Sequence, residues 1–227
     1  MVYEKLVARF PQFKAHSPIP TSLYLELARN CSILKSIWYS LRFGGIVMVG
    51  RGSKIRVHRS ASVILGAKSA LAIGLAHDTP AGAVLRMRPR ATLRVEGRVQ
   101  FMRACSVTVG YDAALTIGAG TFLNDGSSLT CDRSVMIGAG CAISSGVRIL
   151  DTDVHKLIHD EGARPDAPVC IGRACWIGTN AVILKGTELG EGSVVAAGAV
   201  VRSGVPPRSL VAGVPGRVMR RDITWML

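Results

Sequence analysis

The chain has 227 residues, of which 48% are apolar and 5% aromatic, and 25 are glycine. This length and apolar content suffice for one domain, but its core must consist of small and aliphatic side chains rather than stacked rings. The longest uncharged apolar run, residues 44–50, is too short to span a bilayer, and nothing at the start resembles a signal peptide. We therefore expect a cytoplasmic protein that is neither secreted nor membrane-spanning.

The net charge of +13 is concentrated in one part of the chain, because residues 51–103 contain eleven Lys or Arg and only Asp78 and Glu96 as acids. Such a field attracts nucleic acid, acidic lipid surfaces, or phosphorylated small molecules and glycans. Aromatic residues that stack on bases are scarce, and no known nucleic-acid-binding motif is present. We therefore expect no nucleic acid, but an acceptor that can be anionic or lipid-linked, and at most a peripheral contact with the inner membrane surface.

Apolar residues in the N-terminal region recur at helical spacing between a potential N-cap, Thr21 or Ser22, and a stop at residues 44–45; they are Leu23, Leu27, Leu34, Ile37 and Leu41. One interpretation is a helical cap over the open end of a repeat domain. The other is a basic amphipathic helix that lies on a membrane. Glu26 and the modest density of basic residues favour the cap.

Residues 84–116 alternate between apolar and polar side chains, which predicts short strands, with Arg86, Arg88 and Arg90 along one outward face. From Ile171 an aliphatic residue recurs every six positions, and four residues after each one comes a small or branched residue. The aliphatic column is Ile171, Ile177, Ile183, Leu189, Val195 and Val201; its small partners are Cys175, Ala181, Thr187, Ser193, Ala199 and Val205. The same frame covers Ile117, Leu123 and Leu129 and, after a two-residue slip, Ile137, Ile143 and Ile149.

A six-residue period has a direct geometric meaning. Alternation along a strand sends the aliphatic residue and the residue four later to the same side, and a turn follows every sixth residue. Three such strands close a triangular coil of roughly 18 residues, and stacked coils form a narrow all-β core. The six cysteines form no C-x-x-C pair, so we expect buried thiols rather than zinc ligands or disulfides, with Cys141 and Cys175 in the column of small core residues.

The period breaks once, at residues 151–168, where Asp151, Asp153 and His155 form a D-x-D-x-H string. An extended segment would place these three side chains on one side. A carboxylate beside an imidazole fixes its tautomer and raises its basicity, which a general base requires. A solvated loop of charges is the simpler alternative. Excursions from a regular scaffold are common sites of function.

These hexads, the D-x-D-x-H break, Trp176-Ile-Gly and the sequence Ala212-Gly-Val-Pro-Gly-Arg217 resemble the left-handed β-helix acyltransferases, in particular the sugar O-acetyltransferases. The resemblance covers residues 115–221 well and residues 20–114 loosely. It implies that the fold is a left-handed parallel β-helix. We expect the chain to consist of an N-terminal cap (1–50), the β-helix (51–221) and a C-terminal tail (222–227).

The resemblance also implies site residues. His155 would be the general base and Asp153 an orienting group. Residues contacting acetyl-CoA would be Trp176, Thr179, Ala197, Arg202, Arg217 and Arg220, and residues contacting the acceptor would be Asn124 and Asp132, although residues 124–125 can equally be a plain turn. Trp176 is too large for the triangular interior, so we expect it to point outward.

The implied activity is acetyl transfer from acetyl-CoA to a hydroxyl of a saccharide or related metabolite, by direct attack in a ternary complex of a homotrimer. N-acetylation of an amino sugar, or a non-catalytic module that binds an anionic polymer, are the alternatives. The spacing of His77, His155 and His159 does not favour a zinc site, so no metal is expected.

Overall fold

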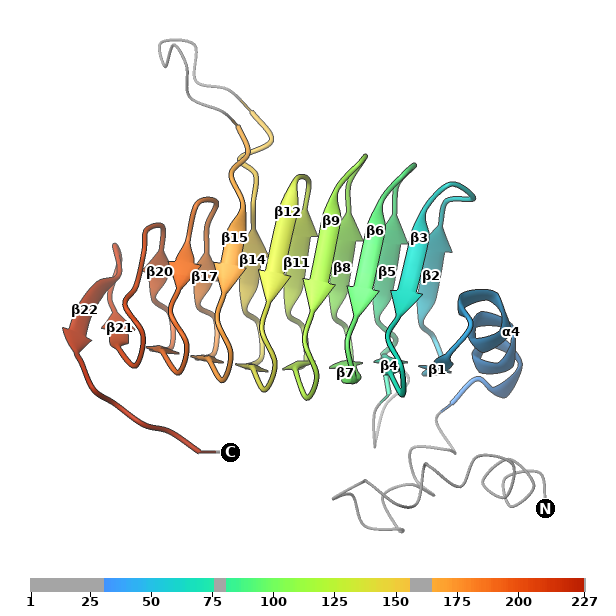
Figure 1. Ribbon diagram of the computed structural model, residues 1–227, viewed down its shortest axis with the longest axis horizontal. Helices are drawn as coiled ribbons and strands as arrows, with labels where there is room; N and C mark the ends of the chain where they lie inside the picture. Colours follow the sequence, from blue (N-terminus) through green and yellow to red (C-terminus); the bar gives the residue numbers. More distant parts are fainter. Residues whose placement is uncertain (1–30, 76–80, 156–164, 227) are drawn as a thin grey trace.

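The computed structural model describes residues 31–75, 81–155 and 165–226. Its strands form three sheets that are the three sides of a left-handed parallel β-helix (Figure 1). The first sheet contains β1 (Ile46–Val49), β4 (Ala70–Ile73), β7 (Arg98–Phe101), β10 (Phe122–Leu123), β13 (Ala142–Ile143), β16 (Trp176–Ile177), β19 (Val194–Val195), β21 (Leu210–Ala212) and β22 (Arg217–Arg220). The second contains β2 (Lys54–Val57), β5 (Val84–Met87), β8 (Ser106–Val109), β11 (Ser128–Cys131), β14 (Arg148–Leu150), β17 (Val182–Ile183) and β20 (Val200–Val201). The third contains β3 (Ser62–Leu65), β6 (Thr92–Val95), β9 (Ala114–Ile117), β12 (Ser134–Ile137), β15 (Val169–Ile171) and β18 (Glu188–Leu189).

The chain visits the three sheets in turn, so each coil has three corners. We call the turn from the first sheet to the second the first corner, the turn from the second to the third the second corner, and the turn back to the first sheet the third corner. Neighbouring coils pair in register: Val195 is opposite Ile177, and Ile149 lies between Leu129 and Ile183. The hexad period is therefore confirmed as one strand and one corner per repeat.

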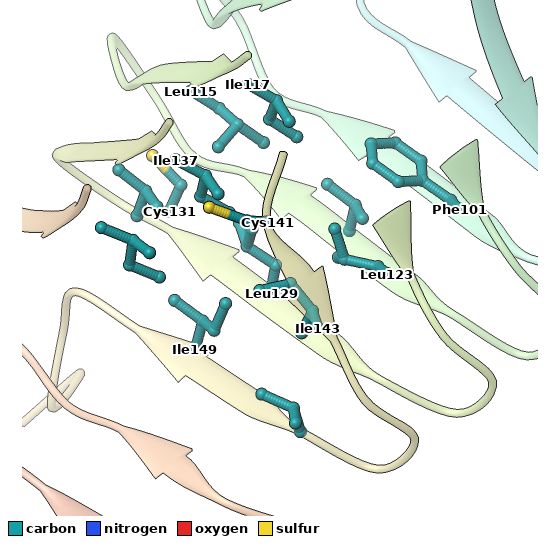
Figure 2. Packing of buried hydrophobic residues seen from close by; sticks show 14 of the residues in the cluster. Phe101, Leu115, Ile117, Leu123, Leu129, Cys131, Ile137, Cys141, Ile143 and Ile149 are labelled. Atoms are coloured by element: carbon teal, nitrogen blue, oxygen red, sulfur yellow. The ribbon is translucent and has the colours of Figure 1, made fainter. Parts of the chain in front are cut away.

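Both predicted columns lie in the core. The aliphatic residues from Ile171 to Val201 are at most 3% exposed, and their counterparts in the preceding coils pack in the same stack (Figure 2). In the small column, hydroxyl and thiol groups donate to a carbonyl of the next coil: Thr121 Oγ1 to Gly138 O at 2.7 Å, Ser193 Oγ to Pro206 O at 2.8 Å and Cys141 Sγ to Gly172 O at 3.1 Å. These side chains therefore join successive coils at the corners while they satisfy their own buried polar atoms.

The six cysteines are free thiols, and Cys141 and Cys175 lie in the buried small column as expected. Two corner positions show why glycine is frequent elsewhere in the corners. Ala174 and Asn180 occupy them with φ of 48° and 57°, in the left-handed region that glycine adopts without steric cost.

The only helix among the described residues, α4 (Ile33–Phe43), lies at the N-terminal end of the β-helix against β1 (Figure 1). It ends where predicted, with Gly44 in a left-handed conformation. The predicted helix from Thr21 or Ser22 is not continuous, because Ser32 is extended and is the N-cap of α4, and Cys31 forms an antiparallel bridge with Gly50; residues 21 and 22 lie outside the described residues. Its apolar residues do not face the β-helix: Leu34 and Leu41 are 83% and 80% exposed, and Ile37 is 43% exposed. The residues that face the β-helix are instead polar or aromatic.

Hydrogen bonds explain this orientation. Strand β2 is the first strand of the second sheet and has no preceding coil to pair with, so alternate carbonyls along its outer edge find no partner within the sheet. Three of these in and beside β2 accept hydrogen bonds from the helix, from Lys35 Nζ to Ser53 O, Tyr39 Oη to Ile55 O and Arg42 Nη2 to Val57 O. Because a strand edge needs polar partners, the polar face of α4 is the face that caps it.

The division of the chain at residue 50 stays a prediction, although β1 already pairs with β4 in the first sheet before that boundary. At the other end, β22 returns antiparallel along β21, and the tail continues over the third corner. There Ile223 N donates to Arg208 O, and Trp225 Nε1 donates to Ala174 O at 2.7 Å.

Candidate functional site

The excursion at residues 151–168 leaves the β-helix at the second corner, between β14 and β15, and its base is firmly held. Thr152 and Asp166 form an antiparallel bridge, Asp153 N donates to Pro165 O at 2.7 Å, and Ala167 N donates to Asp151 O at 2.9 Å. Val154 N donates to Thr152 Oγ1 at 3.0 Å. Residues 156–164 of the predicted excursion lie outside the described residues.

Asp151 is a structural anchor. Its side chain is fully buried, and its carboxylate accepts three backbone hydrogen bonds of 2.7–2.8 Å from Asp132, Arg133 and Ser134. The three donors are the two residues of the turn between β11 and β12 and the first residue of β12, so this carboxylate joins the start of the excursion to the preceding coil. A carboxylate is well suited to this place because its two oxygens only accept.

The expectation that Asp151, Asp153 and His155 share one side is wrong. Asp151 is buried, whereas Asp153 and His155 are exposed. Val154 has φ of 66°, so the segment is not the extended strand on which the alternation depends.

Asp153 has a partner that the sequence analysis missed. Its Oδ2 lies 2.6 Å from Nζ of Lys185, which follows β17 at the second corner of the next coil. The repeat frame contains the signal for this contact. Ile149 and Ile183 are cross-strand neighbours, so the residues that follow each of them reach the same corner.

Asp132 lies at the second corner one coil before the excursion. At the same corner of the two preceding coils, Arg88 lies 5.9 Å from the centre of the exposed Tyr111 ring. The pKa of the Asp132 carboxyl is raised by partial burial and by the negative charges of Asp151 and Asp166, and Arg88 opposes this effect. Arg88 and Tyr111 were not singled out together from the sequence. They become neighbours because strands β5 and β8 pair in the second sheet.

Substitution of Asp132 by asparagine is expected to raise the melting temperature at pH 7. A raised pKa means that ionisation costs the folded state free energy, so stability increases as pH falls through the folded pKa. The gain from the substitution should therefore fade toward pH 3.5, below the ordinary carboxyl pKa of about 4.

Asp112 provides the matched control one coil earlier. Hydrogen bonding from Arg90 lowers the pKa of its carboxyl, so Asp112→Asn should act in the opposite direction at pH 7. Thermal unfolding of both variants at the two pH values tests the pair. An equal shift for Asp132→Asn at both pH values would contradict the assignment.

Asn124 is placed at a different corner from His155. It lies at the first corner of the coil whose second corner carries Asp132, so strand β11 separates the two residues. Its Oδ1 accepts from Asp125 N, and Ser127 N donates to its carbonyl, so residues 124–127 form a turn. Four residues of strand span roughly 13 Å, too far for one small acceptor to touch both side chains from the same protomer.

Thr179 and Ala197 stack on each other at the first corner, where Gly198 N donates to Thr179 O at 2.9 Å. Both are exposed, and the backbone approaches closely: a Cβ on Gly178 would come 2.6 Å from Ala197 N. Trp176 points outward as predicted, with 43% exposure. Its Nε1 donates to Ser144 Oγ, and its ring lies 6.0 Å from that of Trp225 in the tail.

The three arginines do not form one group. Arg217 and Arg220 are exposed on β22, the last strand of the first sheet, opposite Ala212 and Leu210 of β21. Arg202 follows β20 and is exposed at the second corner. Arg217, the first residue of β22, thus lies near the first corner, whereas Arg202 lies at the second corner. The width of the second sheet separates the two arginines.

Within the described ranges there is no group of three or more side chains that could hold a metal ion, and His77 and His159 lie outside those ranges. No helix in the described part of the chain is long and apolar enough to cross a membrane.

Comparison with known proteins agrees with this architecture. Residues 171–203 match the family of bacterial transferase hexapeptide repeats (six repeats). The galactoside O-acetyltransferase of Escherichia coli K12 is 31% identical over 140 residues, which cover 56% of this chain and 69% of that protein. The putative lipopolysaccharide biosynthesis O-acetyl transferase WbbJ of the same organism is 34% identical over 110 residues, which cover 44% of this chain and 56% of WbbJ.

Among solved structures, the polySia-specific acetyltransferase NeuO superposes with a TM-score of 0.52 and 20% identity, over 77% of this chain and 84% of NeuO. That likeness establishes the fold. Since the match to galactoside O-acetyltransferase covers more than two thirds of that enzyme, and residues 171–203 match the hexapeptide repeats, the chain belongs to the hexapeptide-repeat acetyltransferase family.

Proposed function

We propose that the protein transfers the acetyl group of acetyl-CoA to a hydroxyl of a saccharide or a related hydroxylated metabolite. The observation that carries this proposal is the excursion from the hexad scaffold at residues 151–168. It presents the exposed imidazole of His155 at the corner where the preceding coil carries Asp132 and the following coil carries Lys185, which pairs with Asp153 of the excursion. The relatives named O-acetyltransferases support an oxygen acceptor.

In the proposed reaction, His155 takes the proton of the acceptor hydroxyl as its oxygen attacks the thioester carbonyl. The C–O bond forms, the C–S bond breaks, and the proton passes to the departing sulfur, so the products are an acetyl ester and free CoA thiol. No covalent acyl-enzyme is needed. A positioned general base of this kind contributes about 10²–10⁴-fold to the rate.

Asp153 contributes indirectly in this proposal. Its carboxylate pairs with Lys185, and its backbone N–H is fixed to Pro165, so it holds the segment that carries His155. Asp132 would bind hydroxyls of the acceptor as a charged acceptor of hydrogen bonds. Such bonds are stronger than those between neutral groups.

The proposed donor surface lies at the first corner. Small, exposed side chains at Thr179 and Ala197 leave the backbone open to an extended amide chain, as the pantetheine arm requires. Trp176 borders this surface on the first sheet. Arg217 and Arg220 follow on β22, where their guanidinium groups suit the phosphates of CoA.

Residues proposed for one reaction therefore occupy two corners of a protomer: His155 and Asp132 at the second, and Asn124, Thr179 and Ala197 at the first. A closed three-fold assembly that places the second corner of one protomer against the first corner of the next would unite them. We propose this homotrimer, with the site between subunits. Arg202, at the second corner, would then approach CoA bound to the neighbouring protomer.

The experiment that tests the function is a panel of matched hydroxyl and amino sugars, read by release of free thiol from acetyl-CoA. Oxygen transfer predicts turnover on hydroxyl acceptors and an alkali-labile product. Preferential turnover of the amino sugars with an alkali-stable product would assign N-acetylation instead. Absence of thiol release with every acceptor would contradict the proposal.

Substitution of Arg217 by alanine is expected to raise KM for acetyl-CoA about tenfold while kcat changes less than twofold, because a phosphate contact binds ground state and transition state alike. Arg173→Ala is the control, since Arg173 is an exposed arginine at the third corner. Steady-state kinetics with varied acetyl-CoA distinguish the two variants. Equal KM values for both would remove Arg217 from the donor surface.

A further inference from the structure

Helix α4 carries an exposed apolar stripe at the N-terminal end of the β-helix. It consists of Ile33, Leu34, Ile37, Trp38 and Leu41, whose exposed fractions range from 43% to 83%. Residues three and four apart lie on one face of a helix, so these side chains form a continuous surface. Large contiguous apolar surfaces of this kind usually mark a site of interaction.

The stripe cannot turn inward without loss of the contacts on the opposite face. Tyr39 Oη donates to Ile55 O at 3.0 Å, Ser40 Oγ bonds with both backbone groups of Val47, and Ser36 Oγ accepts from Val49 N. The Tyr39 and Phe43 rings stack at 5.5 Å and pack against the core. The helix is therefore oriented by the strand edge that it caps, and its apolar face is left outside.

Exposed positive charges surround the same end of the molecule. On the first coil they are Arg51 at the first corner, Lys54 and Arg56 on β2, Arg59 at the second corner and Lys68 at the third corner. We call these five residues the basic ring. Lys35 and Arg42 on α4 add two more positive charges, and residues 31–75 contain no Asp or Glu.

Charge is balanced differently farther along the β-helix. The ion pairs of the described residues, Arg90–Asp112, Arg103–Asp125, Arg133–Asp166, Lys185–Asp153 and Arg208–Asp222, all lie beyond residue 81. The excess of positive charge thus remains at the end that also carries the apolar stripe. Neither feature alone identifies a partner, but together they match the surface of an anionic bilayer, which combines negative headgroups with an apolar interior.

We propose that this end of the β-helix docks on an anionic membrane surface. The apolar stripe enters the interfacial region, where Trp38 is the type of residue enriched at this depth, and the basic ring lies at the level of the headgroups. Arg42, whose guanidinium lies 5.1 Å from the Trp38 ring, reaches back toward the phosphates. This surface is separate from the corners that carry the proposed reaction, so membrane docking can be tested independently of acyl transfer.

The test is co-sedimentation of the full chain with vesicles of phosphatidylcholine alone and of phosphatidylcholine with one third phosphatidylglycerol. We expect binding to the anionic vesicles that weakens as salt increases. The double substitution Leu34→Asp and Leu41→Asp should lower the partition coefficient at least about 100-fold, since two buried side chains are lost and two negative charges face the headgroups. Arg56→Glu with Arg59→Glu should lower it by roughly fivefold or more for each cation removed.

The matched controls are Met226→Asp and Arg173→Glu, because Met226 is an exposed apolar residue at the C-terminal end and Arg173 is an exposed arginine at the third corner. Each control should change the partition coefficient only as far as its change in net charge requires. Failure of the full chain to bind anionic vesicles, or equal binding to neutral ones, would overturn the proposal. So would a melting temperature lowered by more than about 5 °C in the double leucine variant, which would mean that the stripe is covered within the chain. A changed oligomeric state in that variant would assign the stripe to a second copy, and tighter binding to a random DNA duplex than to vesicles would assign the ring to nucleic acid.

Discussion

Substitution of His155 by alanine is expected to lower kcat by about 10²–10⁴-fold, with KM for acetyl-CoA within about twofold of the wild type. The imidazole is exposed at the end of a fixed base, so its loss removes a proton acceptor without opening a cavity. Donor contacts proposed for the first corner are untouched. The melting temperature should therefore stay unchanged while turnover disappears.

The measurement is the rate of thiol release at saturating acetyl-CoA, with binding of CoA determined separately by calorimetry. His58→Ala is the matched control, because His58 is also exposed and contacts only the neighbouring Ser60 through its ring. His155→Gln separates hydrogen bonding from proton transfer, since the amide can bond to the hydroxyl but cannot take its proton. A value of kcat within threefold of the wild type in either His155 variant would exclude His155 as the general base.

Substitution of Asp151 by alanine is expected to destabilise the fold by about 2–4 kcal/mol, because three backbone N–H groups lose their acceptor. Activity should also fall, since the carboxylate joins the turn bearing Asp132 to the segment that carries His155. Asp151→Asn should be intermediate: it keeps one acceptor oxygen but places an NH₂ group against N–H donors.

Denaturant unfolding, followed together with turnover, measures both effects. Asp153→Ala is the matched control two residues away, since a partly exposed ion pair such as Asp153–Lys185 contributes only about 0–1 kcal/mol. If Asp151→Ala were no less stable than Asp153→Ala, the anchoring role of Asp151 would be wrong. If Asp151→Ala were destabilised as expected but kept the activity of the wild type, Asp151 would not position the site.

The two aspartates of the D-x-D-x-H string show where sequence reasoning succeeds and where it ends. The string correctly identified the break in the scaffold. It did not separate the buried carboxylate from the exposed one, because that distinction depends on the turn at Asp132–Ser134, which is distant in sequence, and on the left-handed conformation of Val154. Strand alternation predicts side-chain direction only while the strand continues.

Helix α4 gives the same lesson. Its apolar spacing predicted a helix and Gly44 its end, and both are confirmed for residues 33–43, whereas the predicted continuation back to Thr21 or Ser22 is interrupted at residues 31–32. The usual rule that the apolar face turns inward was wrong here, because the surface that α4 covers is the open edge of β2, with carbonyl groups to satisfy. Periodicity shows that a helix has two faces, but only the neighbouring element determines which one is buried.

The sequence by itself determined the β-helix, its hexad core, the outward direction of Trp176 and the position of the excursion, because each follows from local alternation and the size of side chains. Only the tertiary structure decided which residues meet across coils. Asp153 with Lys185, Asp132 near Arg88, and the division of the proposed site residues between two corners all depend on how the coils stack. The physical reason is that a hexad fixes whether a side chain points in or out, whereas the register between coils fixes its neighbours.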